Sequence, residues 1–374
     1  MANNNKHTGP NVPALRFPEF SGEWEQCQIK DFGKVITGST PPTSKTEYYD
    51  NGEFLWASPA DLGNVKDVVS TKTKLSQQGF DKCRKIPAHS ILVTCIGSTI
   101  GKMGMATTEM ATNQQINSII PIDCSPDYVY YSIQSRFPKY ITSIATQAVP
   151  ILSKSVFESL DSYKTSIEEQ NKIGKLLHLL DERIDAQSKI IEEQETFLKS
   201  LADSLISSQV TNMAINDCVV ARSSAMKESE LENSGPFPVF GASGLCGYSN
   251  EALEESDSIL VTKDGSGVGT CQYATGAHSF LGTLCSLTAK EGTYLPYVYY
   301  ALLNFNFASF KTGLAIPHIY FKDYGKAVIY CPSYDEQVRI ASGLEKIEAK
   351  IKSDKELLKQ YQLQKEYLLS RMFI

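Results

Sequence analysis

The strongest constraint on the fold of this 374-residue chain is an internal repeat. Four pairs of stretches match in the same order at offsets of 167 to 169 residues: LVTCIGSTIGK with LVTKDGSGVGT, YVYY with YVYY, AVPIL with AIPHI, and SIEEQNKIGKLL with SYDEQVRIASGL. They begin at Leu92 and Leu260, Tyr128 and Tyr297, Ala148 and Ala315, and Ser166 and Ser333. A nearly constant offset kept over four matches indicates a duplicated unit with small loop insertions.

Each copy of the repeat has two parts of different character. Residues 14–165 and 210–331 are rich in Gly, Pro, Ser, Thr and aromatic residues, and short β-like runs such as SILVTCI and SILVTK alternate with turn residues. We predict that each of these ranges folds as a compact α+β domain. Residues 166–209 and 332–374 are predicted to be long helices, because they hold many strong helix formers. Residues 1–13 are predicted to be a flexible N-terminus.

The predicted helices carry apolar residues at alternating steps of four and three, the spacing of a coiled-coil seam. The candidate helix-pairing residues are Ile173, Leu177, Leu180, Ile184, Gln187, Leu198 and Leu201 in the first helix, with Phe197 beside them, and Ile340, Leu344, Ile347, Ile351, Asp354 and Leu368 in the second. The polar interruptions Gln187 and Asp354 fall at the same repeat position, and we interpret them as residues that fix the register.

Two arrangements of these helices are open. Each helix could pack on its own domain, but a helix of this length extends about 60 Å, beyond the width of a small domain. We therefore expect the two helices to pair antiparallel, which would relate the domains by a pseudo-twofold axis at the ends of a rod. Duplex DNA suits such a protein, since grooves on one face recur every 34 Å or so.

Composition excludes several classes of protein. The nine cysteines are isolated, without a C-x-x-C pair or a histidine at ligand spacing, so no metal site or disulfide framework is predicted. No stretch has the length of a signal peptide core or a membrane span, so we expect a cytoplasmic protein without membrane contact. The net charge of −6 argues weakly against a protein that holds nucleic acid unaided.

Several motifs on this duplicated frame resemble one family. They are RFPEFSGEWE (16–25), TGSTPPTSKTEYYDNGEFLWASPADL (37–62), ATNQQINSIIP (111–121) and GPFPVFGASGLCGY (235–248), together with the helix starts EEQNKI and DEQVRI. Over nearly its entire length the chain is similar to the specificity subunit of type I restriction–modification systems. NQQI has no clear twin in the second copy, where the equivalent region reads HSFLGTL, so residue roles do not transfer between halves.

The resemblance implies an α+β fold with two similar target-recognition domains, joined by two long antiparallel coiled-coil helices that act as a spacer. It implies recognition of a bipartite double-stranded DNA target and two methyltransferase subunits and restriction subunits as partners. S-adenosylmethionine, ATP and magnesium are then expected only on those partners, and this chain is expected to be non-catalytic, with no cofactor.

Enzyme motifs are missing from the sequence. An adenine methyltransferase would have an Asn/Asp-Pro-Pro-aromatic tetrapeptide, whereas the Pro41-Pro42 pair is flanked by threonines. The stretch CIGSTIGK has three residues between its glycines rather than the four of a phosphate loop, and Met103 follows its lysine. In the second copy the glycines recur and the lysine does not, which indicates a glycine turn after a buried strand rather than a nucleotide site.

Candidate DNA contacts are polar and basic residues in loops, because these side chains read base edges and hold phosphates. The first domain offers Ser39, Thr40, Ser44, Lys45, Lys72, Lys74, Arg84, Lys85, Asn113, Gln114 and Gln115, and the second offers Ser243, Lys263, Ser266 and His318. Ordinary solvated surface charge and structural hydrogen bonding are the alternative roles for these residues.

Two other functions fit parts of the sequence. A scaffold protein could use the same coiled coil to dimerise while its two domains bind ligands or proteins. A nucleotide-dependent enzyme could be built on the glycine-rich turns. DNA footprinting separates the scaffold from a bipartite DNA reader, and nucleotide-binding calorimetry tests the enzyme.

Overall fold

The computed structural model describes residues 10–63, 65–142, 151–313 and 316–374, which include all the predicted site residues but not residues 1–9 or Pro150. Two compact units are formed: unit 1 from residues 1–189 and 356–374, and unit 2 from residues 190–355. Helices α4 (Ile167–Ala202) and α8 (Tyr334–Met372) each contribute one segment to each unit. The units therefore divide the chain within the helices, whereas the predicted boundaries at 165/166, 209/210 and 331/332 separate the helices from the domains.

Unit 1 contains a five-stranded sheet in the order β2-β10-β7-β8-β4, a four-stranded sheet in the order β5-β3-β9-β6, and the pair β1-β11. The strands are β1 Glu25–Gln28, β2 Gly33–Thr37, β3 Phe54–Ala57, β4 Asp67–Val68, β5 Thr73–Leu75, β6 Lys85–Ile86, β7 Ile91–Thr94, β8 Met103–Ala106, β9 Met110–Thr112, β10 Ile116–Pro121 and β11 Asp161–Lys164. The helices are α1 Gln77–Phe80, α2 Pro126–Thr142 and α3 Lys154–Glu158.

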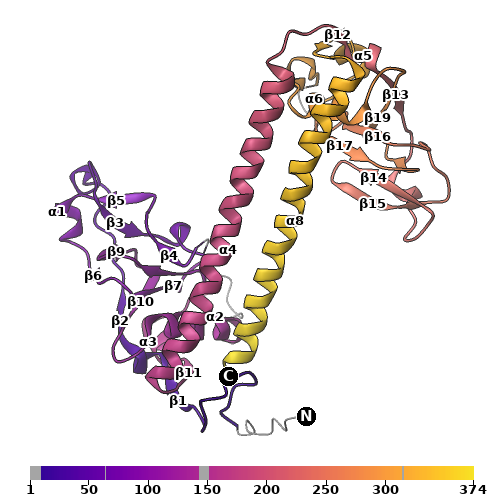
Figure 1. Ribbon diagram of the computed structural model, residues 1–374. Coiled ribbons are helices and arrows are strands. Elements are labelled where there is room, and N and C mark those ends of the chain that lie inside the picture. Colours follow the sequence, from indigo (N-terminus) through magenta and orange to yellow (C-terminus); the bar gives the residue numbers. More distant parts are fainter. Residues whose placement is uncertain (1–9, 64, 143–150, 314–315) are drawn as a thin grey trace, which may run out of the picture. The chain divides into compact units, whose positions relative to one another are not determined.

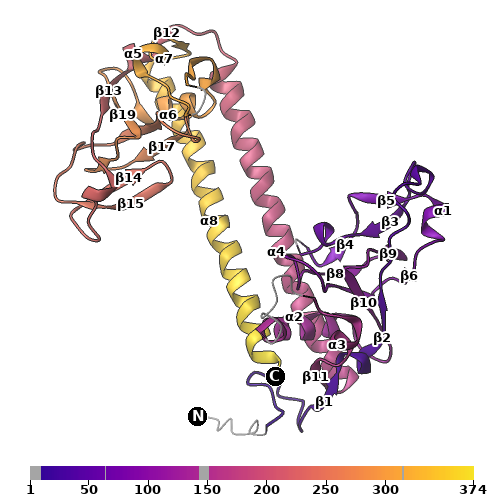
Figure 2. The same cartoon turned by 180° about the vertical axis from the view of Figure 1, so that it is seen from behind.

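Strand β7 is buried along its entire length because both faces of its sheet are covered. Ile91 and Val93 point into the core shared with α2, whereas Leu92 belongs to a second core that includes Leu55 and Ile86 of the other sheet. Alternate side chains of a strand face opposite sides of the sheet, so a continuous apolar run suits this middle layer. Figure 1 shows the resulting layers of unit 1, and Figure 2 shows α2 and α3 beside the first half of α4.

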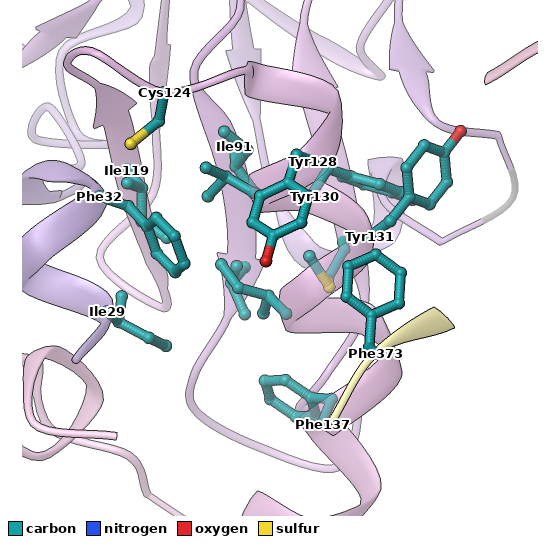
Figure 3. Close-up of a cluster of buried hydrophobic side chains, with 14 of the residues drawn as sticks. Ile29, Phe32, Ile91, Ile119, Cys124, Tyr128, Tyr130, Tyr131, Phe137 and Phe373 are labelled. Atoms are coloured by element: carbon teal, nitrogen blue, oxygen red, sulfur yellow. The ribbon is translucent and has the colours of Figure 1, made fainter. Parts of the chain in front are cut away.

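The main core of unit 1 takes side chains from both ends of the sequence (Figure 3). The ring of Tyr128 on α2 lies 5.8 Å from Trp24 and 5.6 Å from Phe373, measured between ring centroids. Met372, at the end of α8, and Phe373 are both at least 93% buried. The final residues of the chain thus help to complete the core of its first domain.

Unit 2 repeats this architecture with a four-stranded sheet in the order β13-β19-β16-β17, a three-stranded sheet in the order β15-β14-β18, and the pair β12-β20. The strands are β12 Met213–Ala214, β13 Val219–Ser223, β14 Phe237–Gly241, β15 Gly244–Ser249, β16 Ser258–Thr262, β17 Cys271–Ala274, β18 Ser279–Phe280, β19 Leu284–Ala289 and β20 Val328–Ile329. The helices are α5 Ile215–Cys218, α6 Leu295–Leu303 and α7 Phe321–Tyr324.

Equivalent side chains make equivalent hydrogen bonds in the two units. Gln170 accepts from the N–H of Ser125, just before α2, and donates to the carbonyl of Thr165. Gln337 accepts from the N–H of Tyr294, just before α6, and donates to the carbonyl of Pro332. Each glutamine therefore joins the start of its long helix to the start of a domain helix.

The repeated YVYY stretches also make matching contacts. The first tyrosines, Tyr128 and Tyr297, donate to main-chain carbonyls, that of Tyr163 in β11 and that of Tyr330 directly after β20. The last tyrosines bond to carboxylates on the long helices, Tyr131 to Asp181 at 2.6 Å and Tyr300 to Glu348 at 2.7 Å. Sequence similarity at the predicted offsets thus corresponds to a structural repeat of an α+β domain.

Within each unit the halves of α4 and α8 contact each other. In unit 1, Asp181 pairs with Lys365 at 2.6 Å, and the Arg183 guanidinium lies over the Tyr361 ring. Asp181 precedes Arg183 on α4, whereas its partner Lys365 follows Tyr361 on α8, so the paired segments are antiparallel. In unit 2, the Asp354 carboxylate accepts a hydrogen bond of 2.9 Å from the Gln194 amide.

The predicted helix-pairing residues divide into two groups. The residues near the helix ends pack into the domain cores. They are Ile173, Leu177 and Leu368 in unit 1 and Leu198, Leu201, Ile340 and Leu344 in unit 2. Leu180 and Ile351 are buried nearer the middle, whereas Ile184 and Ile347 are partly buried. Phe197 is 56% exposed, so the prediction that it holds the helix pair together is wrong.

The two predicted register residues differ in their partners. Asp354 is 4% exposed and bonds to Gln194 and to Lys350. The buried Nε2 atom of Gln187 has no hydrogen-bond partner among the described residues. The same position of the repeat therefore carries a satisfied polar contact in the second helix only.

Candidate nucleic-acid interface

The two glycine-rich stretches form the same turn between antiparallel strands. Gly97 and Gly101 have φ angles of 98° and 93° in the β7–β8 turn, and Gly265 and Gly269 have φ angles of 96° and 92° in the β16–β17 turn. These conformations favour glycine because a Cβ atom is strained there. A phosphate loop joins a strand to a helix, so the geometry agrees with the predicted glycine turn and not with a nucleotide site.

This turn lies at one end of the five-stranded sheet of unit 1. Strand pairing places Thr37, the last residue of β2, opposite Asn117, and Thr94, the last residue of β7, opposite Ile116. The loop after β2, the glycine turn after β7 and the loop before β10 consequently meet at the same edge. We call this edge, residues 37–40, 95–99 and 113–115, the loop end of unit 1.

Hydrogen bonds connect the predicted polar residues at this loop end. The Arg84 N–H donates to Ser39 Oγ at 3.0 Å, and its guanidinium donates to the Thr37 carbonyl at 2.8 Å. Thr40 hydrogen-bonds to Gln114, and the Asn113 amide donates to Gln115 Oε1 at 3.0 Å. Thr40, Arg84 and Gln114 are exposed, whereas Asn113 is buried. The structure thus brings together six residues predicted from separate stretches.

Unit 2 has an equivalent loop end, formed by residues 223–226, 263–267 and 281–283. Ser223, at the end of β13, pairs with Cys285, and Thr262, at the end of β16, pairs with Leu284. The Lys263 N–H bonds to the Thr283 carbonyl, just as the Cys95 N–H bonds to the Gln115 carbonyl in unit 1. This contact identifies LGTL (281–284) as the structural twin of NQQI (113–116).

The structure adds two segments that the sequence-based candidates omit. Residues 224–226 occupy the place of 38–40, since the Gly282 N–H bonds to the Met226 carbonyl at this edge. Thr283 occupies the place of Gln115. The offset of 168 residues could have located Thr283, but residues 224–226 lie at a different offset from their twins because the loops between the copies differ in length.

A hydrogen-bonded polar cluster forms at the loop end of unit 2. His318 Nδ1 lies 2.7 Å from one oxygen of Asp264, and Lys263 Nζ lies 2.8 Å from the other. Partial burial would raise the pKa of Asp264, but the hydrogen bonds from Lys263 and His318 outweigh it and lower that pKa. Ser266 is exposed in the same glycine turn. Three of the four candidates in the second domain are therefore neighbours.

The other candidates lie outside the two loop ends. Ser44 and Lys45 are exposed in a loop before β3, and Lys45 pairs with Glu47. Lys72, Lys74 and Lys85 are exposed on or beside strands β5 and β6 of the four-stranded sheet. Lys85 is paired with Asp81 at 2.7 Å.

Ser243 is exposed in the β14–β15 turn of unit 2. Residues 224–257, which include this hairpin, contain Lys227 as their only basic residue and seven acidic residues: Glu228, Glu230, Glu232, Glu251, Glu254, Glu255 and Asp257. Such a concentration of negative charge repels phosphate, which argues against Ser243 as a DNA contact.

A cavity of about 960 Å³ lies in unit 1 where the glycine turn meets α2, α4 and α8. Its walls include Tyr130 and Phe137. Of its three acidic lining residues, Asp181, Asp185 and Glu366, Asp181 is already bonded to Tyr131 and Lys365. Among the described residues, no group of three or more His, Cys, Asp or Glu side chains is placed to hold a metal ion. No helix in the described part of the chain is both long and apolar enough to cross a membrane.

Two repeated α+β domains with matching loop ends, joined by two long helices, define a tandem recognition protein. The chain belongs to the type I restriction modification DNA specificity domain family, whose model matches residues 21–196 and 208–362. The family model matches twice, which agrees with the structural repeat.

Curated relatives are similar to parts of the chain. The specificity subunit of the type I restriction enzyme MjaIX from Methanocaldococcus jannaschii is 30% identical over 45% of this chain and 40% of its own length. The HindI specificity subunit from Haemophilus influenzae is 35% identical over 39% of this chain and 32% of its own length. The chain thus spans less than half the length of these relatives in the matched regions.

Solved structures share the fold. The S subunit of a type I restriction-modification system from M. genitalium superposes with a TM-score of 0.69 at 18% identity, over 97% of this chain and 99% of the other. A chain from a study of complex assembly in the type I R-M system gives a TM-score of 0.57 at 13% identity, over 93% of this chain and 97% of the other. The similarity supports an architecture of two domains joined by helices.

Proposed function

We propose that this chain is the DNA-specificity subunit of a type I restriction–modification complex and that each unit reads one half of a bipartite target. The observation that carries the proposal is the recurrence of one loop end, built from equivalent turns and strand ends, in two domains of one chain. Side chains differ between the two loop ends while the backbone framework is kept. Two similar frameworks with different surfaces suit two half-sites of different sequence.

The polar side chains at the loop ends have the chemistry for base recognition. In the major groove, carboxamides such as Gln114 pair with adenine, and arginines such as Arg84 pair with guanine. The hydrogen bond that Thr40 donates to Gln114 holds this carboxamide in place before DNA binds, which reduces the entropy lost on binding.

The acidic balance of the chain suits a subunit that works with partners. We propose that methyltransferase subunits, two for each chain, supply much of the contact with the phosphate backbone and all of the catalysis, and that restriction subunits add the nuclease. S-adenosylmethionine, ATP and magnesium would bind to those partners and not to this chain. A DNA substrate inside the cell would place the complex in the cytoplasm.

The test is a footprint of the chain assembled with its methyltransferase on duplex DNA that carries the methylated motif. We expect two protected half-sites separated by a gap in which base substitutions have no effect on affinity. Gln114→Ala would weaken discrimination in one half-site only, while Gln78→Ala, at an exposed glutamine outside the loop end, would leave both unchanged. One contiguous recognition site, or none, would contradict the proposal and favour a protein scaffold.

A further inference from the structure

One backbone position beside the glycine turn is equivalent in the two units and carries different chemistry in each. Ile151 forms an isolated bridge with Ile96 in unit 1, and His318 forms one with Asp264 in unit 2. The residue after each donates its N–H to the carbonyl of the residue that follows the central strand, at 2.8 Å in unit 1 and 2.9 Å in unit 2. Both positions thus lie beside the loop end of their own unit.

In unit 1 this position presents an apolar side chain to solvent. Ile151 is 50% exposed, although it borders the polar loop end with its carboxamides and hydroxyls. An apolar side chain beside a base-reading surface has one specific use in the major groove, which is contact with the C5-methyl group of thymine.

In unit 2 the same position presents an oriented imidazole. Asp264 has a lowered pKa, so near neutral pH its carboxylate is ionised and can only accept hydrogen bonds. His318 Nδ1, 2.7 Å from that carboxylate, must therefore carry the proton. A neutral ring in this tautomer keeps Nε2 as an acceptor, and the His318 side chain is 35% exposed.

We propose that position 151/318 contacts a base in each half-site, with Ile151 against a thymine methyl group and His318 Nε2 accepting from the exocyclic amine of adenine or cytosine. Those amines are the hydrogen-bond donors that base pairs present in the major groove. Asp264 is then a positioning residue, because it fixes the tautomer of His318. This inference rests on the proposed function and assigns one contact to each half.

The experiment is selection from randomised duplexes by the chain assembled with its methyltransferase, with wild type and variants in parallel. His318→Asn retains a group that can bond to Asp264 but lacks an acceptor at Nε2. We expect its preference at one base pair of the second half-site to fall by roughly tenfold to a hundredfold, with the first half-site unchanged. His318→Gln, whose longer carboxamide supplies an acceptor near Nε2, would retain most of that preference.

Ile151→Ala is the matching change in unit 1. A thymine preference at one position of the first half-site is expected to weaken, with the second half-site unchanged. The controls are His89→Asn and Ile122→Ala, exposed residues of the same types elsewhere in unit 1, which would leave the selected motif intact. Urea unfolding of every variant confirms that the fold is retained.

The outcomes separate this inference from the proposed function. If wild type selects no bipartite motif, the proposed function fails and the inference fails with it. If wild type selects a bipartite motif that His318→Asn and Ile151→Ala both leave unchanged, the proposed function stands and position 151/318 is not a base contact.

Discussion

Buried hydrogen-bonding side chains explain why particular residues recur in this repeat. Gln170 and Gln337 are 1% and 2% exposed, and each satisfies backbone groups at the start of a domain helix. Helix starts leave N–H groups without partners inside the helix, and a buried unpaired group is costly. A side chain of another shape at these positions would leave donors and acceptors unsatisfied in the core.

Gln337→Met is therefore expected to destabilise unit 2 by about 2 kcal/mol, because methionine fills the space but leaves the Tyr294 N–H and the Pro332 carbonyl unpaired. Urea unfolding measures the change. Gln360→Met, at an exposed glutamine of the same helix, provides the control and would alter the free energy of unfolding by less than about 0.5 kcal/mol. Equal effects of the two substitutions would contradict this account of Gln337.

The lowered pKa of Asp264 predicts that the folded protein loses stability at acidic pH. Its pKa is lowered in the folded protein, so folding favours the ionised carboxylate. That stabilisation is present above the ordinary aspartate pKa of about 4 and is lost as the pH falls through the lowered value. Asp264→Asn would thus be less stable than wild type at pH 6, with the difference shrinking towards pH 3. Urea midpoints at the two pH values test this, and a constant difference would refute it.

At the scale of elements, the glycine turns show which parts of the repeat are constrained by the backbone. Gly265 and Gly269 have nearly the same φ, but their surroundings differ. A Cβ atom on Gly265 would meet no other atom within 4 Å, whereas one on Gly269 would approach Phe307 to 2.9 Å. In unit 1 the counterpart Gly101 lies against the ring of Phe137. The second glycine of each turn is therefore favoured both by the backbone conformation and by the close packing of a phenylalanine.

Alanine substitutions separate these two contributions. Gly265→Ala is expected to cost about 1–2 kcal/mol of folding free energy from backbone strain alone. Gly269→Ala is expected to cost roughly 1–3 kcal/mol more, because the added methyl group displaces Phe307. Chemical denaturation of both variants gives the difference directly. An equal loss of stability in Gly265→Ala and Gly269→Ala would mean that the Phe307 side chain moves aside with no loss of folding free energy.

The positions of the long helices could be predicted from the sequence, but the surfaces against which their apolar residues pack could not. Helices were expected over 166–209 and 332–374, and they are observed as α4 (Ile167–Ala202) and α8 (Tyr334–Met372). The seam residues near the helix ends, such as Ile173 and Leu344, pack into domain cores. Apolar residues at this spacing can be buried against a partner helix or against a domain core. Periodicity alone therefore could not distinguish these two arrangements.

The candidate site could be predicted only in part, for a similar reason. Ser39, Arg84 and Gln114 come from distant stretches, and strand pairing rather than local sequence brings them together. The contact between Asp264 and His318 spans 54 residues and has no counterpart in the first copy, where Ile96 and Ile151 stand. A repeat locates equivalent positions but not the chemistry that only one copy carries.

At the scale of the whole molecule, helices α4 and α8 each run from one unit into the other, so they are expected to set the gap between half-sites. Inserting seven residues into α4 after Gln187 and seven into α8 after Asp354 would lengthen the helix pair by about 10 Å while preserving the seam. The gap in the recognised DNA is expected to grow by about three base pairs.

Methylation-sensitive sequencing of DNA from cells that carry the lengthened chain would reveal the new motif. The bases read in each half-site are expected to stay the same, because the loop ends are untouched. Insertion of seven residues in the exposed β14–β15 turn serves as the control and would leave the gap unchanged. Altered half-site bases with a constant gap would show that the helices do not set the spacing.

The burial of Met372 and Phe373 in the core of unit 1 has a consequence for the timing of folding. Unit 2 is continuous in sequence, from residue 190 to 355, and can fold as soon as it leaves the ribosome. Synthesis of unit 1 begins first, yet this unit lacks part of its core until Met372 and Phe373 are translated. At about 5–20 residues per second, the first domain waits on the order of ten to forty seconds, so the second domain synthesised is the first that can be completed.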